Sequence, residues 1–260
     1  MIVIISPSKS VTDKQPSYTI DYTEPMFPDI TRVLVKSLGS QSVQQLSKTL
    51  NISKTLATLN HSRYRQWQST EKKSAMWLYS GDVYNGLDSF TMSKKSIAYA
   101  QNNLLIVSGL YGLVRPLDGI RPYRLEMKLP ISGIWGNNLY EAWSKHIAHH
   151  LTSTQTDTIL ICASKEYAKV VTRELPKHIR RITPRFMQET NEGLKEKGLF
   201  AKYARGALAR YAIDNEIESI EQLYSYNKDG FRYSDTASSQ DELVYIVPPD
   251  FTLKGRFTKQ

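Results

Sequence analysis

Cysteine is nearly absent from this sequence. The single cysteine, Cys162, excludes an internal disulfide, and such sparse use is typical of proteins from a reducing compartment. Because Cys162 directly follows an apolar run, we interpret it as a small buried hydrophobic residue rather than as a reactive thiol.

Long apolar runs are absent as well. No segment approaches the roughly 20 apolar residues that a membrane helix needs, so we expect no membrane partner. The apolar start, MIVIIS, is too short for a signal peptide and has no basic leader before it. Together with the scarcity of cysteine, these absences predict a cytoplasmic protein.

The sequence also lacks internal repeats, low-complexity tracts and linkers rich in proline, glycine or serine. Its 260 residues, of which 40% are hydrophobic and 23% are charged, are enough to bury a sizeable core. We therefore predict one compact domain over residues 1–260.

Three short segments are apolar at nearly every position, which is typical of strands buried on both faces of a parallel or mixed sheet. They are residues 2–5, 104–107 and 158–161, and further strands are predicted at 181–187 and 243–247. Apolar residues at three- and four-residue spacing predict helices over 30–38, 43–50, 53–67, 93–102, 138–151, 166–172 and 198–215. The predicted class is α/β, or mixed α+β, with a central mixed sheet flanked by helices.

Each of the three buried strands is followed closely by a serine: Ser6, Ser108 and Ser164. In open α/β sheets, ligands bind outside the carboxyl ends of the strands. If the strands are parallel, the loops after them converge on one crevice. The alternative is that the serines are only helix N-caps, which suits Ser164 before Glu166.

Residues 107–127, VSGLYGLVRPLDGIRPYRLEM, form the most specialised loop. It contains three glycines and two prolines, and we interpret its backbone as a rigid one with tight turns, while arginines such as Arg115 and Arg124 stand beside Asp118 and Glu126. A rigid loop with paired opposite charges predicts a binding or catalytic site.

Two other segments are candidates for the same crevice. In residues 80–87, Tyr84 lies between two glycines that would let the backbone approach a ligand, although an ordinary turn also explains them. On the helix predicted from Gly198, Lys202 and Arg205 share a face suited to a phosphate, and Gly206 beside them would allow close approach.

The formal net charge is +9, and the positive charge is unevenly distributed. Residues 177–210 hold nine Lys or Arg against three Glu. Such a segment attracts polyanions, of which nucleic acid is the commonest for a basic protein, although a solvated basic face without a ligand is the alternative.

Taken together, these segments resemble the YaaA peroxide stress resistance family over nearly the whole chain. The resemblance rests on ISPSK at 5–9, GDVYNGL at 81–87, SGLYGLVRPLDGIRPYRLEM at 108–127, ASKEY at 163–167, YARGALARY at 203–211 and the acidic, serine-rich turn before ELV at 242–244. It implies a bacterial cytosolic protein of the hydrogen peroxide response that limits oxidative DNA damage and lowers reactive iron. It also implies duplex DNA as the partner, bound through a positively charged cleft and a helix-hairpin-helix element.

That element would correspond to residues 43–65, where Asn51 and Ser53 stand in place of the usual hairpin glycines. Such an element binds duplex backbone through hairpin N–H groups and the N-terminus of its second helix, without reading sequence. An ordinary helical hairpin within the core is the alternative. The residues expected at DNA are Lys48, Ile52, Ser53, Lys54, Arg63 and Arg65.

The leading functional hypothesis is therefore sequence-independent binding of duplex DNA, with 177–210 and 43–65 on or near the DNA face. The alternative is a hydrolase or lyase acting on a nucleotide, nucleoside or damaged base, with a phosphate-containing small molecule as its partner. Its candidate catalytic residues are Glu166, Glu126 and Tyr84. Its candidate anion-binding residues are Lys9, Arg115, Tyr123, Arg124, Ser164, Tyr167, Lys202 and Arg205.

Two observations would separate these hypotheses. A deep pocket suited to phosphate would favour the enzyme, whereas a closed, water-sized interior around Glu166 would exclude it. The same residues can also be explained as salt-bridge and hydrogen-bond networks that tie loops together.

We expect no metal site and no cofactor. His146, His149 and His150 have ligand spacing on one predicted helix, but no carboxylate or cysteine nearby in sequence completes a site, so any effect on iron would be indirect. The four tryptophans, Trp67, Trp77, Trp135 and Trp143, are expected in the core and are assigned no function.

Overall fold

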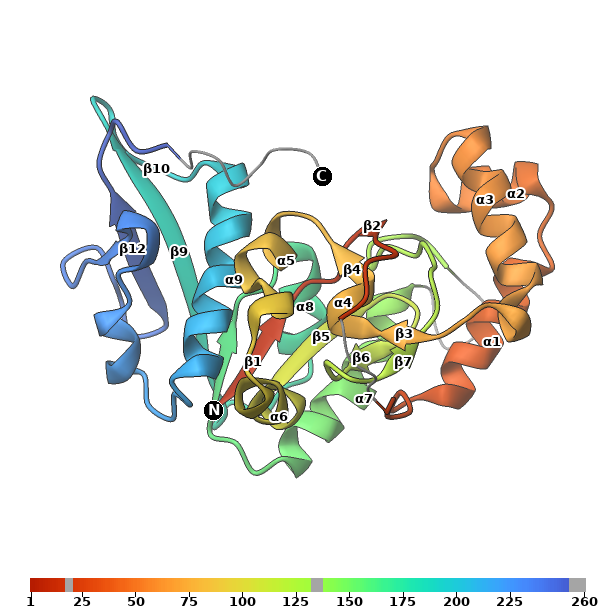
Figure 1. The fold of residues 1–260 in the computed structure, drawn as a ribbon, viewed down its shortest axis with the longest axis horizontal. Coiled ribbons are helices and arrows are strands. Elements are labelled where there is room, and N and C mark those ends of the chain that lie inside the picture. Colours follow the sequence, from red (N-terminus) through yellow and green to blue (C-terminus); the bar gives the residue numbers. More distant parts are fainter. Residues whose placement is uncertain (17–20, 132–137, 253–260) are drawn as a thin grey trace.

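A mixed eight-stranded sheet forms the centre of the molecule (Figure 1). The structure is a computed structural model that describes residues 1–16, 21–131 and 138–252. The strand order is β11-β12-β9-β8-β1-β5-β6, with β10 paired to β9. The parallel core consists of β1 (Ile2–Ile5), β5 (Leu104–Ser108), β8 (Thr158–Ile161), β9 (Arg180–Thr190) and β12 (Glu242–Val247).

All five strands predicted from the sequence are confirmed. Strand β1 lies between β5 and β8, with Val3 paired to both Leu104 and Leu160 in parallel register. These strands are buried on both faces, which explains why they are apolar at nearly every position.

Short antiparallel strands complete the sheet, and the sequence pattern did not predict them. They are β6 (Gly112–Val114) on β5, β10 (Gly193–Lys195) on β9 and β11 (Arg232–Tyr233) on β12. Two smaller pairs lie outside the main sheet: β2 (Ser10–Val11) with β4 (Tyr79–Ser80), and β3 (Lys73–Ser74) with β7 (Gly119–Ile120). Two or three residues are too few to show an alternating pattern.

The predicted helices are present with small shifts at their ends. They are α1 (Pro28–Gly39), α2 (Val43–Leu50), α3 (Lys54–Arg65), α6 (Lys94–Asn103), α7 (Leu139–Ser153), α8 (Lys165–Thr172) and α9 (Gly198–Asp214). The helix predicted over 53–67 ends at Arg65, and a 3₁₀ turn, η1 (Trp67–Ser69), continues the chain. None of the described helices combines the length and the apolar composition that crossing a membrane requires.

Two short helices, α4 (Ala75–Leu78) and α5 (Asp82–Leu87), were not predicted. Helix α5 occupies the segment whose glycines were expected either to let the backbone approach a ligand or to form an ordinary turn, and it packs very closely on α9. A Cβ atom on Gly86 would lie 2.0 Å from the Tyr203 carbonyl oxygen, and one on Gly206 would lie 1.8 Å from that of Val83. Both glycines therefore serve contact between helices, and Gly206 is not where a ligand approaches.

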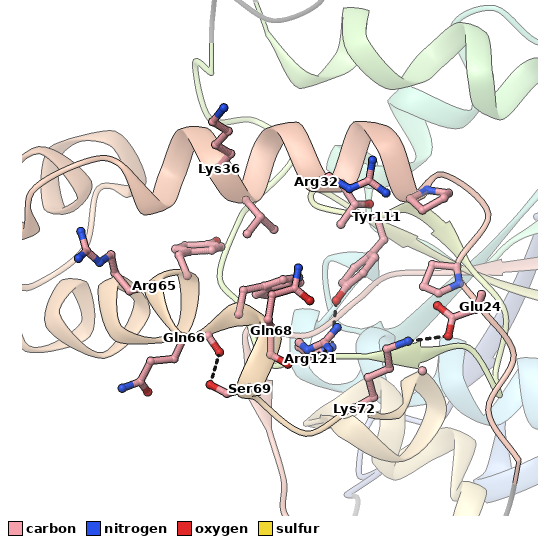
Figure 2. Close-up of a pocket in the computed structure, with 17 residues that line it drawn as sticks. Glu24, Arg32, Lys36, Arg65, Gln66, Gln68, Ser69, Lys72, Tyr111 and Arg121 are labelled. Atoms are coloured by element: carbon pink, nitrogen blue, oxygen red, sulfur yellow. Dashed lines mark hydrogen bonds and ion pairs between the residues drawn. The ribbon is translucent and has the colours of Figure 1, made fainter.

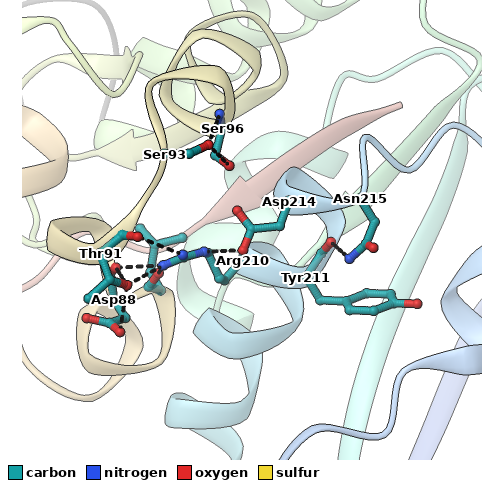
Figure 3. A network of polar contacts seen from close by, with 9 residues as sticks. Asp88, Thr91, Ser93, Ser96, Arg210, Tyr211, Asp214 and Asn215 are labelled. Carbon is teal, nitrogen blue, oxygen red and sulfur yellow. Dashed lines mark hydrogen bonds and ion pairs between the residues drawn. The ribbon is translucent and has the colours of Figure 1, made fainter.

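Arg210 strengthens the contact between α5 and α9 (Figure 3). Its guanidinium donates to the Asp88 carbonyl oxygen at 2.7 Å and to the Thr91 Oγ1 at 3.0 Å, and it pairs with Asp214 at 2.5 Å. One of the nine cations counted in residues 177–210 is thus committed to tying two elements together.

Aromatic side chains fill much of the interior. Trp77 and Trp143 are almost completely buried, and Trp67 is 8% exposed, which confirms the core assignment of these three. Trp135 lies outside the described residues. A second aromatic group, including Phe186, packs around β9 and β12.

Helices α1, α2 and α3 form a lobe at one end of the molecule, away from β9 and β12 (Figure 1). We call residues 28–65 the helical lobe. Gly39 lies against the backbone of Tyr64, where a Cβ atom would be 3.3 Å from the carbonyl oxygen, so the end of α1 sits close to the end of α3.

Candidate functional site

Ser6 and Ser164, which follow β1 and β8, and Ser108, the last residue of β5, lie at the same edge of the sheet because these strands are parallel. The Ser6 Oγ accepts a hydrogen bond from the Ser164 backbone N–H at 2.8 Å, and the Tyr84 hydroxyl donates to the Ser6 carbonyl oxygen at 3.1 Å. The Ser164 side chain makes no capping hydrogen bond to α8, although it occupies the N-cap position. The structure therefore brings these loops together at one edge.

Glu126 lies among three cations at this edge of the sheet. Its carboxylate contacts the Lys9 Nζ at 2.9 Å and the Arg124 Nη2 at 2.9 Å, while the Lys128 Nζ lies 4.0 Å away. Burial by itself would raise the pKa of Glu126, but the hydrogen bonds and charges of Lys9 and Arg124 outweigh burial and lower it. Glu126 is consequently an ionised anchor for two cations.

A chain of buried hydroxyl groups runs beside Glu126. The Tyr123 hydroxyl lies 2.6 Å from the Ser108 Oγ and 2.8 Å from the Tyr79 hydroxyl. Burial raises the pKa of Tyr123 to about 12, and hydrogen bonds from Ser108 and Tyr79 only partly oppose it. Tyr123 is therefore a neutral hydrogen-bonding group at physiological pH.

A hollow of about 30 Å³ lies among these groups, lined by Pro7, Ser8, Lys9, Tyr123, Arg124, Leu125, Glu126 and Tyr167. This volume suits one water molecule rather than a nucleotide. Glu166 does not line the hollow; its Oε1 accepts a hydrogen bond from the Lys128 backbone N–H at 3.2 Å. We call this group the strand-end cluster, comprising Lys9, Tyr84, Tyr123, Arg124, Glu126, Ser164 and Tyr167.

The other anion-binding candidates lie outside the strand-end cluster. Arg115 holds the fully buried Asp118 through its Nε at 3.1 Å and its Nη2 at 2.9 Å, an arrangement that ties the loop to itself. Arg205 pairs with Glu196 at 2.8 Å, and Lys202 is exposed on α9. Lys202 and Arg205 thus do not join Lys9 and Glu126 around one cavity.

The segment 43–65 folds as two helices joined by a tight turn. Ser42 forms a capping box with Gln45, and Ser53 caps α3 by accepting from the Leu56 N–H at 3.4 Å. Between them, Asn51 adopts the left-handed conformation with φ 52°. Asn51 therefore supplies the conformation for which glycine is usual in such hairpins.

The hairpin uses its own turn amides. The Asn51 N–H donates to the Lys48 carbonyl oxygen at 3.2 Å, and the Ile52 N–H donates to that of Ser47 at 3.1 Å. The backbone N–H groups of Asn51 and Ile52 are therefore already hydrogen-bonded within the turn. The groups that remain for a ligand are the N–H groups in the first turn of α3 and the side chains around it. Lys48, Ser53, Lys54 and Arg65 are exposed, whereas Ile52 and Arg63 are partly buried.

Charge distinguishes the helical lobe from the basic segment 177–210. No Asp or Glu occurs between Asp29 and Glu71, while that interval holds six cations: Arg32, Lys36, Lys48, Lys54, Arg63 and Arg65. In 177–210, by contrast, Arg180, Arg185, Lys195, Arg205 and Arg210 all form ion pairs. The cations of the lobe therefore have fewer carboxylates close to them in sequence than those of 177–210.

A cavity of about 500 Å³ lies between α1 and η1 (Figure 2), and no residue pattern singled it out in advance. The cations on its wall are Arg32, Lys36, Arg65, Lys72 and Arg121, and Trp67 and Tyr111 also line it. Of these, only Arg65 was a candidate from the sequence. The sequence feature that could have indicated this cavity is the interval without Asp or Glu between Asp29 and Glu71, because most of the lining residues lie within it.

Within the described residues, no group of three or more His, Cys, Asp or Glu side chains is arranged to hold a metal ion. The ring of His146 lies 5.8 Å from that of Phe27, and burial is the main cause that lowers the pKa of His150. Cys162 is buried, and burial raises the pKa of its thiol to about 12.

Comparisons with known proteins place the chain among bacterial relatives of the same length. It is 36% identical over 255 residues to a UPF0246 protein of Neisseria meningitidis serogroup B, covering 95% of this chain and 98% of that protein. A UPF0246 protein of Legionella pneumophila (strain Philadelphia 1) is also 36% identical over 255 residues, covering 95% and 99%. A sequence profile described as peroxide stress protein YaaA matches residues 1–237. The chain therefore belongs to the YaaA peroxide stress protein family.

Proposed function

We propose that the protein binds duplex DNA without sequence specificity, in the cytoplasm, and thereby limits oxidative DNA damage during peroxide stress. Family membership supports the stress role. The observation that carries the DNA-binding proposal is the helical lobe, in which six cations occur in an interval without any Asp or Glu. Duplex DNA is a dense line of negative charge, so such a surface gains affinity by displacing counterions.

The hairpin supports a particular mode of contact. Lys48 and Lys54 flank the turn and are exposed, and within the described residues neither forms an ion pair. Helix α3 begins at Lys54, so its partial positive charge adds to theirs at the same place. A helix-hairpin-helix role for residues 43–65 is part of this proposal, with the start of α3 rather than the turn amides meeting phosphate.

Salt dependence of binding tests the proposal. We expect the affinity for a fully paired duplex to fall steeply with salt, and the double variant Lys48→Gln, Lys54→Gln to reduce the slope of log K against log salt by about 2. The matched control is Lys94→Gln, Lys145→Gln, which removes two exposed charges outside the lobe. Fluorescence anisotropy with labelled duplex provides the measurement. A flat salt dependence, or equal effects of the two double variants, would contradict the proposal.

An enzyme acting on a nucleotide, nucleoside or damaged base is the second candidate function. The convergence of Lys9, Arg124, Glu126 and Tyr123 favours it, because such groups can hold an anion and move a proton. The hollow of about 30 Å³ and the lowered pKa of Glu126 oppose it, since substrate has no room and the carboxylate is a poor acid. DNA binding is therefore the function that the structure supports better.

A further inference from the structure

The cavity between α1 and η1 shares Arg32, Lys36 and Arg65 with the cations of the helical lobe, and it also has the size of a small-molecule site. Its volume of about 500 Å³ lies within the range of about 300–1,000 Å³ typical of such sites. Five cations line it, against one carboxylate, that of Glu24, which is paired with Lys72 at 2.5 Å. The cavity is therefore suited to an anion.

Three largely buried aromatic residues, Tyr64, Trp67 and Tyr111, line the cavity, and we call this part of its wall the floor. The rings of Tyr64 and Trp67 are stacked with centroids 6.2 Å apart, and Tyr111 lies at the same distance from Trp67 on another side. The Arg121 guanidinium lies 5.7 Å from the Trp67 ring centroid, and its Nε donates to the Thr70 carbonyl oxygen at 2.7 Å. Arg121 is thus held rigidly, as a planar cation against an aromatic ring.

The walls add apolar surface and hydrogen-bonding groups. Pro25, Pro28 and Val35 are apolar, while Gln68 brings a side-chain amide. Amides of this kind pair with the edges of nucleobases. The lining residues Arg32, Lys36 and Arg65 are exposed, and in the described part of the chain the ion-pair partner of Arg32 is Asp29, which is itself largely exposed.

We propose that this cavity binds a single unpaired nucleotide, with the base against the flat groups of the floor and the phosphate among Arg32, Lys36 and Arg65. The combination of planar groups, a side-chain amide and excess positive charge matches a base joined to a phosphate. A base within a duplex is stacked and paired and does not enter such a cavity, so the ligand is either a free nucleotide or an unpaired nucleotide in DNA. The second source rests on the proposed DNA-binding function.

Equilibrium binding of the unmodified protein to three small ligands provides the first test, by titration calorimetry. We expect deoxyadenosine monophosphate to bind at least tenfold more tightly than deoxyribose 5-phosphate, and inorganic phosphate to bind more weakly still. Equal binding of the first two, or no detectable binding of the nucleotide, would overturn the proposal. No variant is needed for this comparison.

Charge variants locate the site. The triple variant Arg32→Gln, Lys36→Gln, Arg65→Gln is expected to weaken nucleotide binding at least tenfold. The control triple variant Lys94→Gln, Lys145→Gln, Lys177→Gln removes the same charge from exposed positions outside the cavity, and it is expected to change binding less than twofold. Equal losses in the two variants would mean that the cavity is not the site.

Binding measurements with duplex DNA distinguish a free nucleotide from an unpaired nucleotide in DNA as the ligand. Tighter binding of a duplex with one bulged nucleotide than of the fully paired duplex would assign the cavity to unpaired DNA, whereas nucleotide binding without that preference would assign it to free nucleotide. Salt-dependent binding of the paired duplex without any nucleotide binding would refute this inference alone. Nucleotide binding without duplex binding would refute only the DNA-binding proposal.

Discussion

At the residue scale, Glu126 is a carboxylate held between two cations at the buried edge of the sheet. Its lowered pKa means that the folded state binds this proton less readily than the unfolded chain, whose value is near 4.5. The carboxylate therefore contributes stability above about pH 4.5, and that contribution is lost as the pH falls through the lower folded-state pKa. Its surroundings indicate an anchor for Lys9 and Arg124.

We expect Glu126→Gln to lower the free energy of unfolding by about 2 kcal/mol at pH 7, because charge-assisted hydrogen bonds to Lys9 and Arg124 are lost. The difference from the unmodified protein should narrow as the pH falls below about 4.5, since the wild-type carboxylate then becomes protonated. Urea unfolding at several pH values measures this.

The control for that substitution is Glu24→Gln, at an exposed pair with Lys72, which should cost well under 1 kcal/mol. If the difference in the free energy of unfolding between Glu126→Gln and the unmodified protein stays constant from pH 7 to pH 3, Glu126 acts through its shape rather than its charge. Affinity for the fully paired duplex should not change in Glu126→Gln if the helical lobe is the binding surface.

At the element scale, the close packing of α5 on α9 depends on Gly86 and Gly206, where a Cβ atom would overlap the backbone of the other helix. The same helix pair is also joined by Arg210, which reaches the carbonyl groups at the end of α5 (Figure 3). Close helix contact therefore explains GDVYNGL and YARGALARY at least as well as a ligand does. Lys202 on α9 is exposed, so the packing of α5 on α9 does not explain its presence.

We expect Gly206→Ala to destabilise the protein by about 1–3 kcal/mol or more, because the new Cβ atom would lie 1.8 Å from the backbone oxygen of Val83. Gly198→Ala, near the start of the same helix, has no heavy atom within 4 Å of the added Cβ and should be neutral or slightly stabilising. Thermal unfolding of both variants compares them directly. Similar midpoints would contradict the close packing of α5 on α9.

At the scale of the whole molecule, the central sheet includes a strand that lies beyond the residues matched by the family profile. The profile ends at residue 237, but β12 lies between β9 and β11 and pairs with both. Tyr245 on β12 is fully buried, and its ring stacks on Phe186 with centroids 5.4 Å apart. Residues 242–247 are therefore part of the folded sheet.

A chain ending at Gln240 should lose cooperative unfolding, because β9 would lose a parallel neighbour and β11 would lose its partner. By comparison, Tyr245→Phe keeps the strand and removes only the hydrogen bond to the Leu223 carbonyl oxygen, at a cost of about 1–2 kcal/mol. Circular dichroism during urea unfolding distinguishes the two. Cooperative unfolding of the shortened chain would show that β12 is dispensable.

The sequence by itself determined the elements whose signal is local. Residues 2–5, 104–107 and 158–161 are apolar at nearly every position, and this pattern correctly predicted strands buried on both faces of a parallel or mixed sheet. Helix periodicity likewise located α1, α2 and α9 within a few residues of their ends. The motifs in the loops predicted the family, because their order and spacing are written in the chain.

Only the tertiary structure decided which charges are available. The pairing of Arg205 with Glu196 depends on side-chain positions that the spacing of the two residues does not encode. The close contact at Gly86 and Gly206 depends on two helices more than 100 residues apart in the chain, as their numbers show. The cavity beside Trp67 arises for the same reason, because its walls come from α1, η1 and the loop at Arg121 and meet only when the chain is folded.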